Sequence, residues 1–242
     1  NVFYYRSSVD SEWELHGVYD YGEGKIVPWT FTEDGERLLV SCSVNNSVEG
    51  LCEYDPETRI LKEKYRHPVV DISGGIWQND LEEPIGLVVA DGRVKNVWLN
   101  EKAMKGRKIR ALEKTFSDYR VVVTSSTINE EEMVLRVGSD KDPGGYYIFN
   151  TVSNELKDLD MNRRGWIKAS EMAVMEPIKF KARDGLEING YLTRPNESKG
   201  NLPMIMMVHG GPHGVRDYWG YDQEAQFLAN RGYAVMQLNY RG

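Results

Sequence analysis

Two stretches of the 242-residue chain carry the same local pattern, and their spacing limits the folds that the first half can adopt. Residues 30–43 and 115–126 each contain an aromatic residue, an acidic turn, an arginine, three apolar or β-branched residues and then small hydroxylated residues. The two aromatic residues, Phe31 and Phe116, lie 85 positions apart, which corresponds to two units of about 42 residues. Repeats of this length are typical of four-stranded units that stack, because one unit cannot bury both of its faces.

Strand and turn signals elsewhere in the first half fit the same frame. Residues 50–64 predict a strand, a turn at Asp55-Pro56 and an edge strand, and residues 145–154 repeat that arrangement. Residues 85–99 hold two apolar strands around an Asp-Gly pair, which is a strong hairpin signal. Residues 101–114 are charged and helix-compatible and predict an insertion between strands.

These signals together predict the fold class of the first half. We expect two and a half to three C-terminal blades of an incomplete β-propeller over residues 1–165. An irregular β-sandwich is the alternative.

The pattern changes near Arg164. Residues 166–177 lack strand alternation and are assigned to a linker, so that a second domain covers residues 178–242. There we expect a hairpin, a strand that is apolar on every residue and therefore covered on both faces, a helix and a second covered strand. These elements are expected at residues 177–192, 204–208, 221–231 and 233–238. Two covered strands joined through a helix predict a right-handed parallel crossover, and hence the N-terminal part of an α/β domain.

Charge and composition exclude several functional classes. The net charge of −7 and the pI near 5.3 argue against a nucleic-acid partner, which normally requires a basic surface. The longest apolar run, residues 202–208, is far too short to cross a membrane. No cluster of metal ligands and no phosphate-binding loop is present in the sequence, so we expect no cofactor and no metal. The first residues resemble a strand and not a signal peptide, which leaves the compartment open between cytoplasmic and periplasmic or secreted.

Two cysteines, Cys42 and Cys52, flank residues 45–47, a plausible hairpin turn. Across paired strands the two thiols could face each other and form a disulfide. We favour two buried free thiols, because a single pair does not make a disulfide framework.

The motif that carries chemistry lies between the two apolar strands, at residues 208–213, Val-His-Gly-Gly-Pro-His. The carboxyl end of a parallel strand is where α/β enzymes place ligands and reacting groups. Without a Cβ atom, Gly210 and Gly211 allow a sharp turn that aims a backbone N–H at a developing oxyanion. A His-Gly-Gly motif of this kind forms part of the oxyanion hole in lipases and esterases.

Three features together resemble the prolyl oligopeptidase family of serine peptidases, most closely its acylaminoacyl-peptidase and dipeptidyl-peptidase-like branch. They are the motif 209–212, the helix that ends at Gly232-Tyr233, and Asn-Tyr-Arg-Gly at residues 239–242. That family places a β-propeller before an α/β-hydrolase domain, the order predicted here. The resemblance is strong over residues 178–242 and architectural over the remainder.

The resemblance implies roles for individual residues. The N–H of Gly211, together with that of Gly210, would donate to the oxyanion, and His209 would shape the loop and not act as the base. Tyr218 and Trp219 belong to an aromatic segment that could line a substrate cleft or simply pack. Arg241 would tie the loop after the second strand or contact substrate.

The catalytic nucleophile is missing from the sequence. No Gly-x-Ser-x-Gly pentapeptide occurs, and the nearest candidate, at residues 71–75, has an aspartate in the first glycine position. We therefore expect a fragment that is itself inactive, from a peptidase of short peptides or acyl-peptides with its Ser-Asp-His triad beyond residue 242. A carboxylesterase of the same fold and a propeller-based binding module with a vestigial hydrolase part are the alternatives. An incomplete sheet also predicts self-association, and hence a possible homo-oligomer.

Overall fold

The computed structural model describes the whole chain except residues 21–23, 45–47, 79–82, 162–163, 212–213 and 241–242. The chain divides into two compact units. The first contains Asn1–Asp91 and Lys95–Gly106, and the second contains Gly92–Val94 and Arg107–Gly242. Within the described residues, no helix combines the length and the apolar character needed to span a membrane.

Short antiparallel strands make up most of the first unit. A two-stranded sheet precedes a four-stranded sheet in chain order and then a three-stranded sheet. Their strands are β1 (Val2–Tyr5) and β2 (Glu14–Val18); β3 (Gly24–Phe31), β4 (Leu38–Val44), β5 (Gly50–Tyr54) and β6 (Leu61–Tyr65); and β7 (Ile72–Ile76), β8 (Gly86–Asp91) and β9 (Arg93–Trp98). The β8–β9 hairpin and the β5–β6 hairpin confirm two of the turn signals read from the sequence.

Strand β4 has apolar residues on both of its faces, which is why it lies inside the unit. Val40 belongs to a buried cluster that includes Phe3 of β1. Its neighbour Leu39 points the other way, into a cluster with Ile72 of β7 and Leu87 of β8. The four-stranded sheet is therefore covered on both sides by its neighbours in the chain.

Cys42 of β4 and Cys52 of β5 form a disulfide, with 6.1 Å between their Cα atoms. Cys52 is opposite Val40 in the ladder, so Cys42 lies two residues further along the same face and both thiols enter the same buried cluster. The expectation of two free thiols was wrong, because strand pairing brings these side chains together. The turn expected at residues 45–47 lies outside the described residues.

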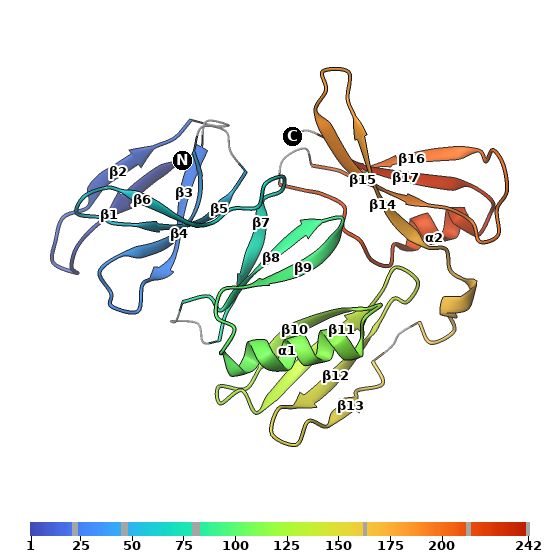
Figure 1. The fold of residues 1–242 in the computed structure, drawn as a ribbon, viewed down its shortest axis with the longest axis horizontal. Helices are drawn as coiled ribbons and strands as arrows, with labels where there is room; N and C mark the ends of the chain where they lie inside the picture. The colour runs from blue at the N-terminus through green and yellow to red at the C-terminus, as the bar shows by residue number, and fades with distance from the viewer. Residues whose placement is uncertain (21–23, 45–47, 79–82, 162–163, 212–213, 241–242) are drawn as a thin grey trace. The chain divides into compact units, whose positions relative to one another are not determined.

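The second unit contains two four-stranded sheets. The first consists of β10 (Arg120–Ser126), β11 (Glu132–Gly138), β12 (Gly145–Asn150) and β13 (Leu156–Asp158), in chain order. Helix α1 (Met104–Thr115) lies across this sheet in Figure 1, and its Leu112 is buried among side chains of β10, β11 and β12. This helix confirms the insertion predicted at residues 101–114.

The repeat of 85 positions does not join equivalent strands. Residues 38–43 form β4, the second strand of its sheet, whereas the matching residues 120–126 form β10, an edge strand. The match between residues 50–64 and 145–154 is consistent, because β5 and β12 are both the third strand of their sheets. These two strands begin at Gly50 and Gly145, which are 95 positions apart. Because neighbouring strands have similar compositions, the match between residues 30–43 and 115–126 paired strands that occupy different positions in their sheets.

The last sheet has the order β14-β15-β17-β16. Its elements are β14 (Met175–Lys181), β15 (Glu187–Thr193), β16 (Met204–Val208) and β17 (Ala234–Asn239), with a 3₁₀ turn at Ala169–Glu171 before them and helix α2 (Gln223–Ala229) between β16 and β17. Strands β16 and β17 are parallel, as predicted for an α/β domain. Helix α2 begins after Asp222, whose side chain accepts a hydrogen bond from the Ala225 N–H at 2.8 Å.

Strand β16 is not covered on both faces as the sequence predicted. It is an edge strand of its sheet, and Met204, Met206 and Val208 are 57%, 54% and 61% exposed. Strand β17, with β15 and β16 on either side, does have buried residues at Ala234, Val235 and Gln237. An all-apolar strand shows that a sequence is suited to burial, but the covering elements must also be present.

Candidate active site

The two glycines of the motif lie beyond the end of the β16–β17 ladder, whose last pair is Val208 with Leu238. Both Gly210 and Gly211 are exposed, and a Cβ atom on Gly210 would meet no atom within 4 Å. Gly211 has φ of +136°, a region that favours glycine. Their amide groups are therefore not used in strand pairing, which is the condition that an oxyanion donor must meet.

Tyr240, just after β17, holds the backbone of this turn. Its ring stacks on the His209 ring with 4.3 Å between centroids and 17° between planes. Its hydroxyl donates to the carbonyl oxygen of His209 at 3.0 Å and lies 3.4 Å from that of Gly210. In a trans peptide the C=O and the next N–H point in opposite directions, so the N–H groups of Gly210 and Gly211 point away from Tyr240.

The loop that follows the motif is tied to the same end of β17. The Asp217 N–H donates to Oδ1 of Asn239 at 2.7 Å, and Nδ2 of Asn239 donates to the Asp217 carbonyl at 3.1 Å. This reciprocal pair fixes the loop against the strand end at a point eight residues after His209. Asn239 and Tyr240 together therefore hold both ends of the loop.

Two buried polar atoms in this region, His209 Nε2 and Asp217 Oδ2, have no hydrogen-bond partner among the described residues. Burial raises the pKa of the Asp217 carboxyl above its ordinary value, and a charge on His209 would act in the opposite direction. Sequence reasoning missed Asp217, Asn239 and Tyr240 as residues that shape the site. The available signals were the Asn-Tyr-Arg-Gly motif at residues 239–242 and its position directly after a strand predicted to be parallel to β16.

The other predicted site residues lie in different environments. Trp219 is 4% exposed, packs with Met175 and Tyr191, and donates its indole N–H to the Met175 carbonyl at 3.0 Å. Tyr218 is 44% exposed, with the Arg216 guanidinium 5.3 Å from its ring centroid. Arg241 lies outside the described residues. A role in substrate binding remains a prediction for all three predicted residues.

Half of the chain is similar in sequence to known peptidases. No protein-family model matches the chain. A stretch of 130 residues, half of the chain, is 30% identical to dipeptidyl aminopeptidase BIII of Pseudoxanthomonas mexicana and covers 19% of that protein. Another of 116 residues is 31% identical to an uncharacterized peptidase of Bacillus subtilis and covers 17% of it. The matched stretches thus span less than a fifth of these relatives.

Solved structures that resemble the chain include peptidases and a related hydrolase. Puromycin hydrolase superposes with a TM-score of 0.59 at 16% identity, over 95% of this chain and 35% of that one. The acylaminoacyl peptidase of Pyrococcus horikoshii gives a TM-score of 0.51 at 18% identity, over 96% of this chain and 34% of that one. These relatives and solved structures support the resemblance of the chain to the prolyl oligopeptidase family.

The order of the elements agrees with this resemblance to the prolyl oligopeptidase family. Its members of known structure join a β-propeller to an α/β-hydrolase domain, and the present chain aligns with about a third of their length. In this chain β16, α2 and β17 follow the strand-rich sheets. The number of blades and the boundaries at residues 165 and 178 remain predictions.

Proposed function

We propose that this chain supplies the oxyanion-stabilising part of a serine peptidase whose Ser-Asp-His triad lies outside the 242 residues. The observation that carries the proposal is that Gly210 and Gly211 are exposed and lie beyond the end of the parallel β16–β17 ladder, so that their N–H groups are not used in strand pairing. Peptidases among the relatives support the reaction class.

The chemistry assigned to these residues is acyl transfer. As a serine oxygen attacks the scissile carbonyl, negative charge develops on the carbonyl oxygen, and the two N–H groups would donate to it. One such donor is worth about 2.7 to 4 kcal/mol of transition-state stabilisation. His209 positions the donors through its stacking with Tyr240 and does not move the proton.

The substrate class in this proposal is short peptides or acyl-peptides. A propeller formed by residues 1–165 and by further blades would exclude folded proteins from the cleft, and residues 166–177 would link it to the hydrolase domain from residue 178. Arg241 and the exposed ring of Tyr218 would contact the substrate.

The location of the triad is tested by labelling with a serine-directed fluorophosphonate. The 242-residue chain should take up no label and hydrolyse neither aminoacyl nor acyl-peptide anilides, because it holds no Gly-x-Ser-x-Gly sequence. The full-length protein that contains this chain should take up one label per molecule. Labelling of the short chain would refute the location of the triad, and failure of the full-length protein to label would favour a binding module.

The oxyanion role is tested in the full-length protein with Gly211→Ala. A Cβ atom at φ of +136° strains the backbone and turns the donor, so kcat should fall about 10²- to 10³-fold. The matched control is Gly185→Ala in the β14–β15 turn, where φ is also positive at +85°, a Cβ atom would meet no atom within 4 Å, and strand β17 separates the hairpin from β16. Equal activities of the two variants would exclude the oxyanion role. Hydrolysis of p-nitrophenyl esters without any hydrolysis of peptide anilides by the unmodified full-length protein would favour the carboxylesterase.

A further inference from the structure

The two faces of the β10–β11 hairpin differ in character. Arg120 pairs with Gly138 and Val122 with Arg136, so these four residues share one face. The residues between them, Val121, Leu135 and Val137, are buried in the cluster that contains Leu112 of α1. Two arginines thus emerge on the side of the sheet that faces away from α1.

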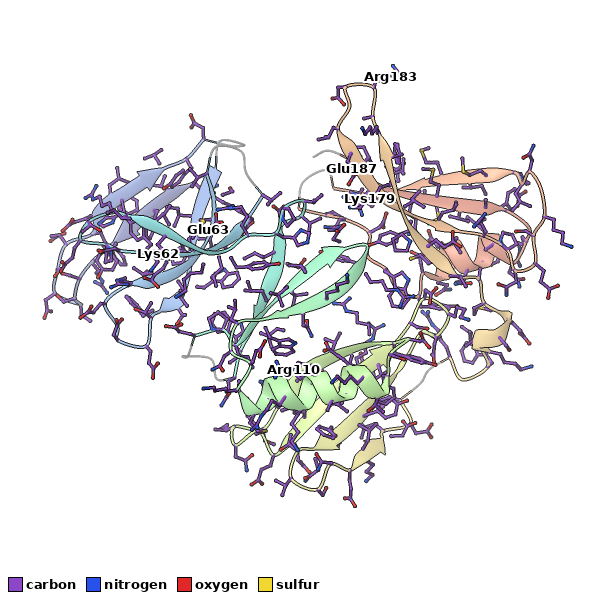
Figure 2. All side chains as sticks on the ribbon, viewed as in Figure 1. Lys62, Glu63, Arg110, Lys179, Arg183 and Glu187 are labelled. Atoms are coloured by element: carbon purple, nitrogen blue, oxygen red, sulfur yellow. A yellow bond between two sulfur atoms is a disulfide. The ribbon has the colours of Figure 1, made fainter. Side chains whose placement is uncertain are left out.

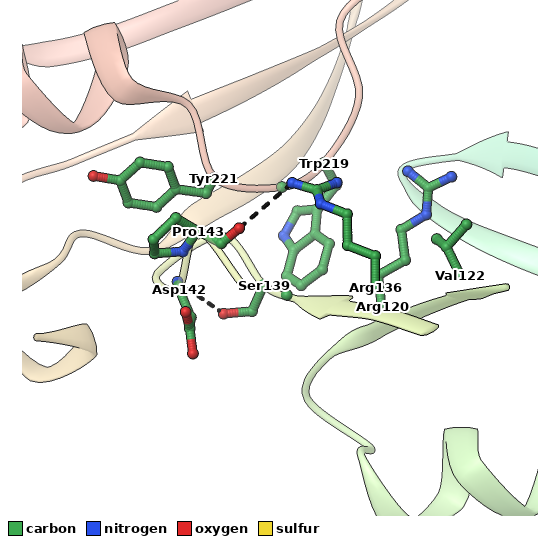
Figure 3. Close-up of a pocket in the computed structure, with 10 residues that line it drawn as sticks. Arg120, Val122, Arg136, Ser139, Asp142, Pro143, Trp219 and Tyr221 are labelled. Atoms are coloured by element: carbon green, nitrogen blue, oxygen red, sulfur yellow. Dashed lines mark hydrogen bonds between the residues drawn. The ribbon is translucent and has the colours of Figure 1, made fainter. Parts of the chain in front are cut away.

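A cavity of about 50 Å³ lies on this arginine-bearing face. Its walls come from the hairpin and from the loop before α2, and include Arg120, Val122, Arg136, Ser139, Trp219 and Tyr221. Figure 3 shows the Arg136 guanidinium beside Trp219 and the Arg120 guanidinium farther along the same face, near Val122. All of these residues belong to the second unit.

Among the residues that the structure describes, no carboxylate pairs with the positive charge at this cavity. Within the described part of the chain, Arg120 is half-buried and makes no hydrogen bond or ion pair, and Arg136 reaches only the Pro143 carbonyl at 3.4 Å. Asp142 also lines the cavity, but its Oδ1 accepts from the Gly144 N–H at 2.8 Å, and Figure 3 shows its carboxylate pointing away from both guanidinium groups. Burial and the neighbouring charge of Arg136 lower the pKa of Arg120.

An anion in the cavity would relieve this repulsion. Guanidinium groups present a planar fork that matches the two oxygens of a carboxylate. The walls beside them are the aromatic rings of Trp219 and Tyr221 and the apolar side chains of Val122 and Pro143. Small size, a guanidinium fork and apolar walls favour a planar monoanion over a phosphate.

We propose that Arg120 and Arg136 form a binding site for a carboxylate group. The group is either a free small carboxylate or the C-terminal carboxylate of a peptide, and the second source rests on the proposed function. Binding itself requires neither the oxyanion donors nor the triad. The site can therefore be tested on the 242-residue chain without any measurement of hydrolysis.

The test is a titration of the ¹⁵N-labelled chain at pH 7 and constant ionic strength. The probes are sodium acetate, Gly-Gly-Gly, Gly-Gly-Gly-amide and inorganic phosphate, and the readout is the indole N–H signal of Trp219, assigned by its loss in Trp219→Phe. Acetate and Gly-Gly-Gly should shift this signal saturably, and the amide should not. Tighter binding of Gly-Gly-Gly than of acetate identifies the peptide as the source, and the reverse order identifies the free carboxylate.

The variants are Arg120→Gln and Arg136→Gln, each of which should weaken binding about tenfold or more, since a charge-assisted hydrogen bond is lost. Arg136 is exposed, so R136Q should fold even if R120Q does not. The control is Arg183→Gln at the tip of the β14–β15 hairpin, which makes the same charge change away from the cavity (Figure 2). The proposal is overturned if R136Q and R183Q bind alike, if the amide binds as tightly as the acid, or if phosphate binds more tightly than either carboxylate.

Discussion

Gln226 offers the most direct test of how the second unit is held together. This buried side chain of α2 makes three hydrogen bonds to backbone groups far away in the sequence. Its Oε1 accepts from the Ala173 N–H at 2.8 Å, and its Nε2 donates to the carbonyl oxygens of Ala173 at 2.7 Å and Asp140 at 2.9 Å. One side chain thus joins the helix, the segment before β14 and the loop after β11.

Gln226→Met keeps a similar side-chain volume and helix propensity but removes all three bonds. A net value of about 1 kcal/mol for each bond predicts a loss of about 3 kcal/mol, and up to about 5 if the buried backbone groups find no water. The matched control is Gln223→Met, an exposed position on the same helix that should change stability by less than about 0.5 kcal/mol.

The assay is equilibrium unfolding of the 242-residue chain in urea, followed by tryptophan fluorescence. Trp219 packs on Met175, at the start of β14 and close in sequence to Ala173, so the transition that includes Trp219 should move to lower urea in Gln226→Met. If Gln226→Met and Gln223→Met unfold at the same urea concentration, the three hydrogen bonds do not hold the unit together and the reasoning fails.

Three further predictions concern charge and surface. Hydrogen bonds from Arg37 and Lys64 lower the pKa of Glu53, so the ionised side chain stabilises the fold above its ordinary pKa and this stabilisation is lost as the pH falls. Glu53→Gln should therefore lower the free energy of unfolding, measured in urea, by about 1 to 3 kcal/mol at pH 7 and by little in acid. Burial raises the pKa of Asp217, so the protein loses stability as the pH rises through this raised pKa. Asp217→Asn should raise the melting temperature at neutral pH but not below pH 4. A lower melting temperature of the variant at pH 7 would contradict this. Met206→Lys on the exposed face of β16 should reduce the self-association expected of the chain in light scattering, and a monomeric unmodified chain would remove the basis for this prediction.

The sequence predicted best those elements whose signals are local. The Asp91-Gly92 turn between β8 and β9 and the capped, Gly-terminated helix α2 need only a few neighbouring residues to specify them. Strand register and covering depend on partners distant in the chain. The 85-residue repeat therefore joined strands of different position, and β16 was expected to be covered although its apolar face is exposed. The Cys42–Cys52 bond depended on register in the same way.

The candidate site shows the same division between local and distant determinants. A glycine pair after an apolar strand is enough to predict that two amides can turn out of a sheet. Their direction, however, is set by Tyr240, whose hydroxyl holds the carbonyl of His209 from the end of the neighbouring strand. Since both residues lie within this chain, the proposed donors can be oriented before any nucleophile is in place. Such preorganisation is what makes backbone donors effective, because no reorganisation is then needed when charge develops.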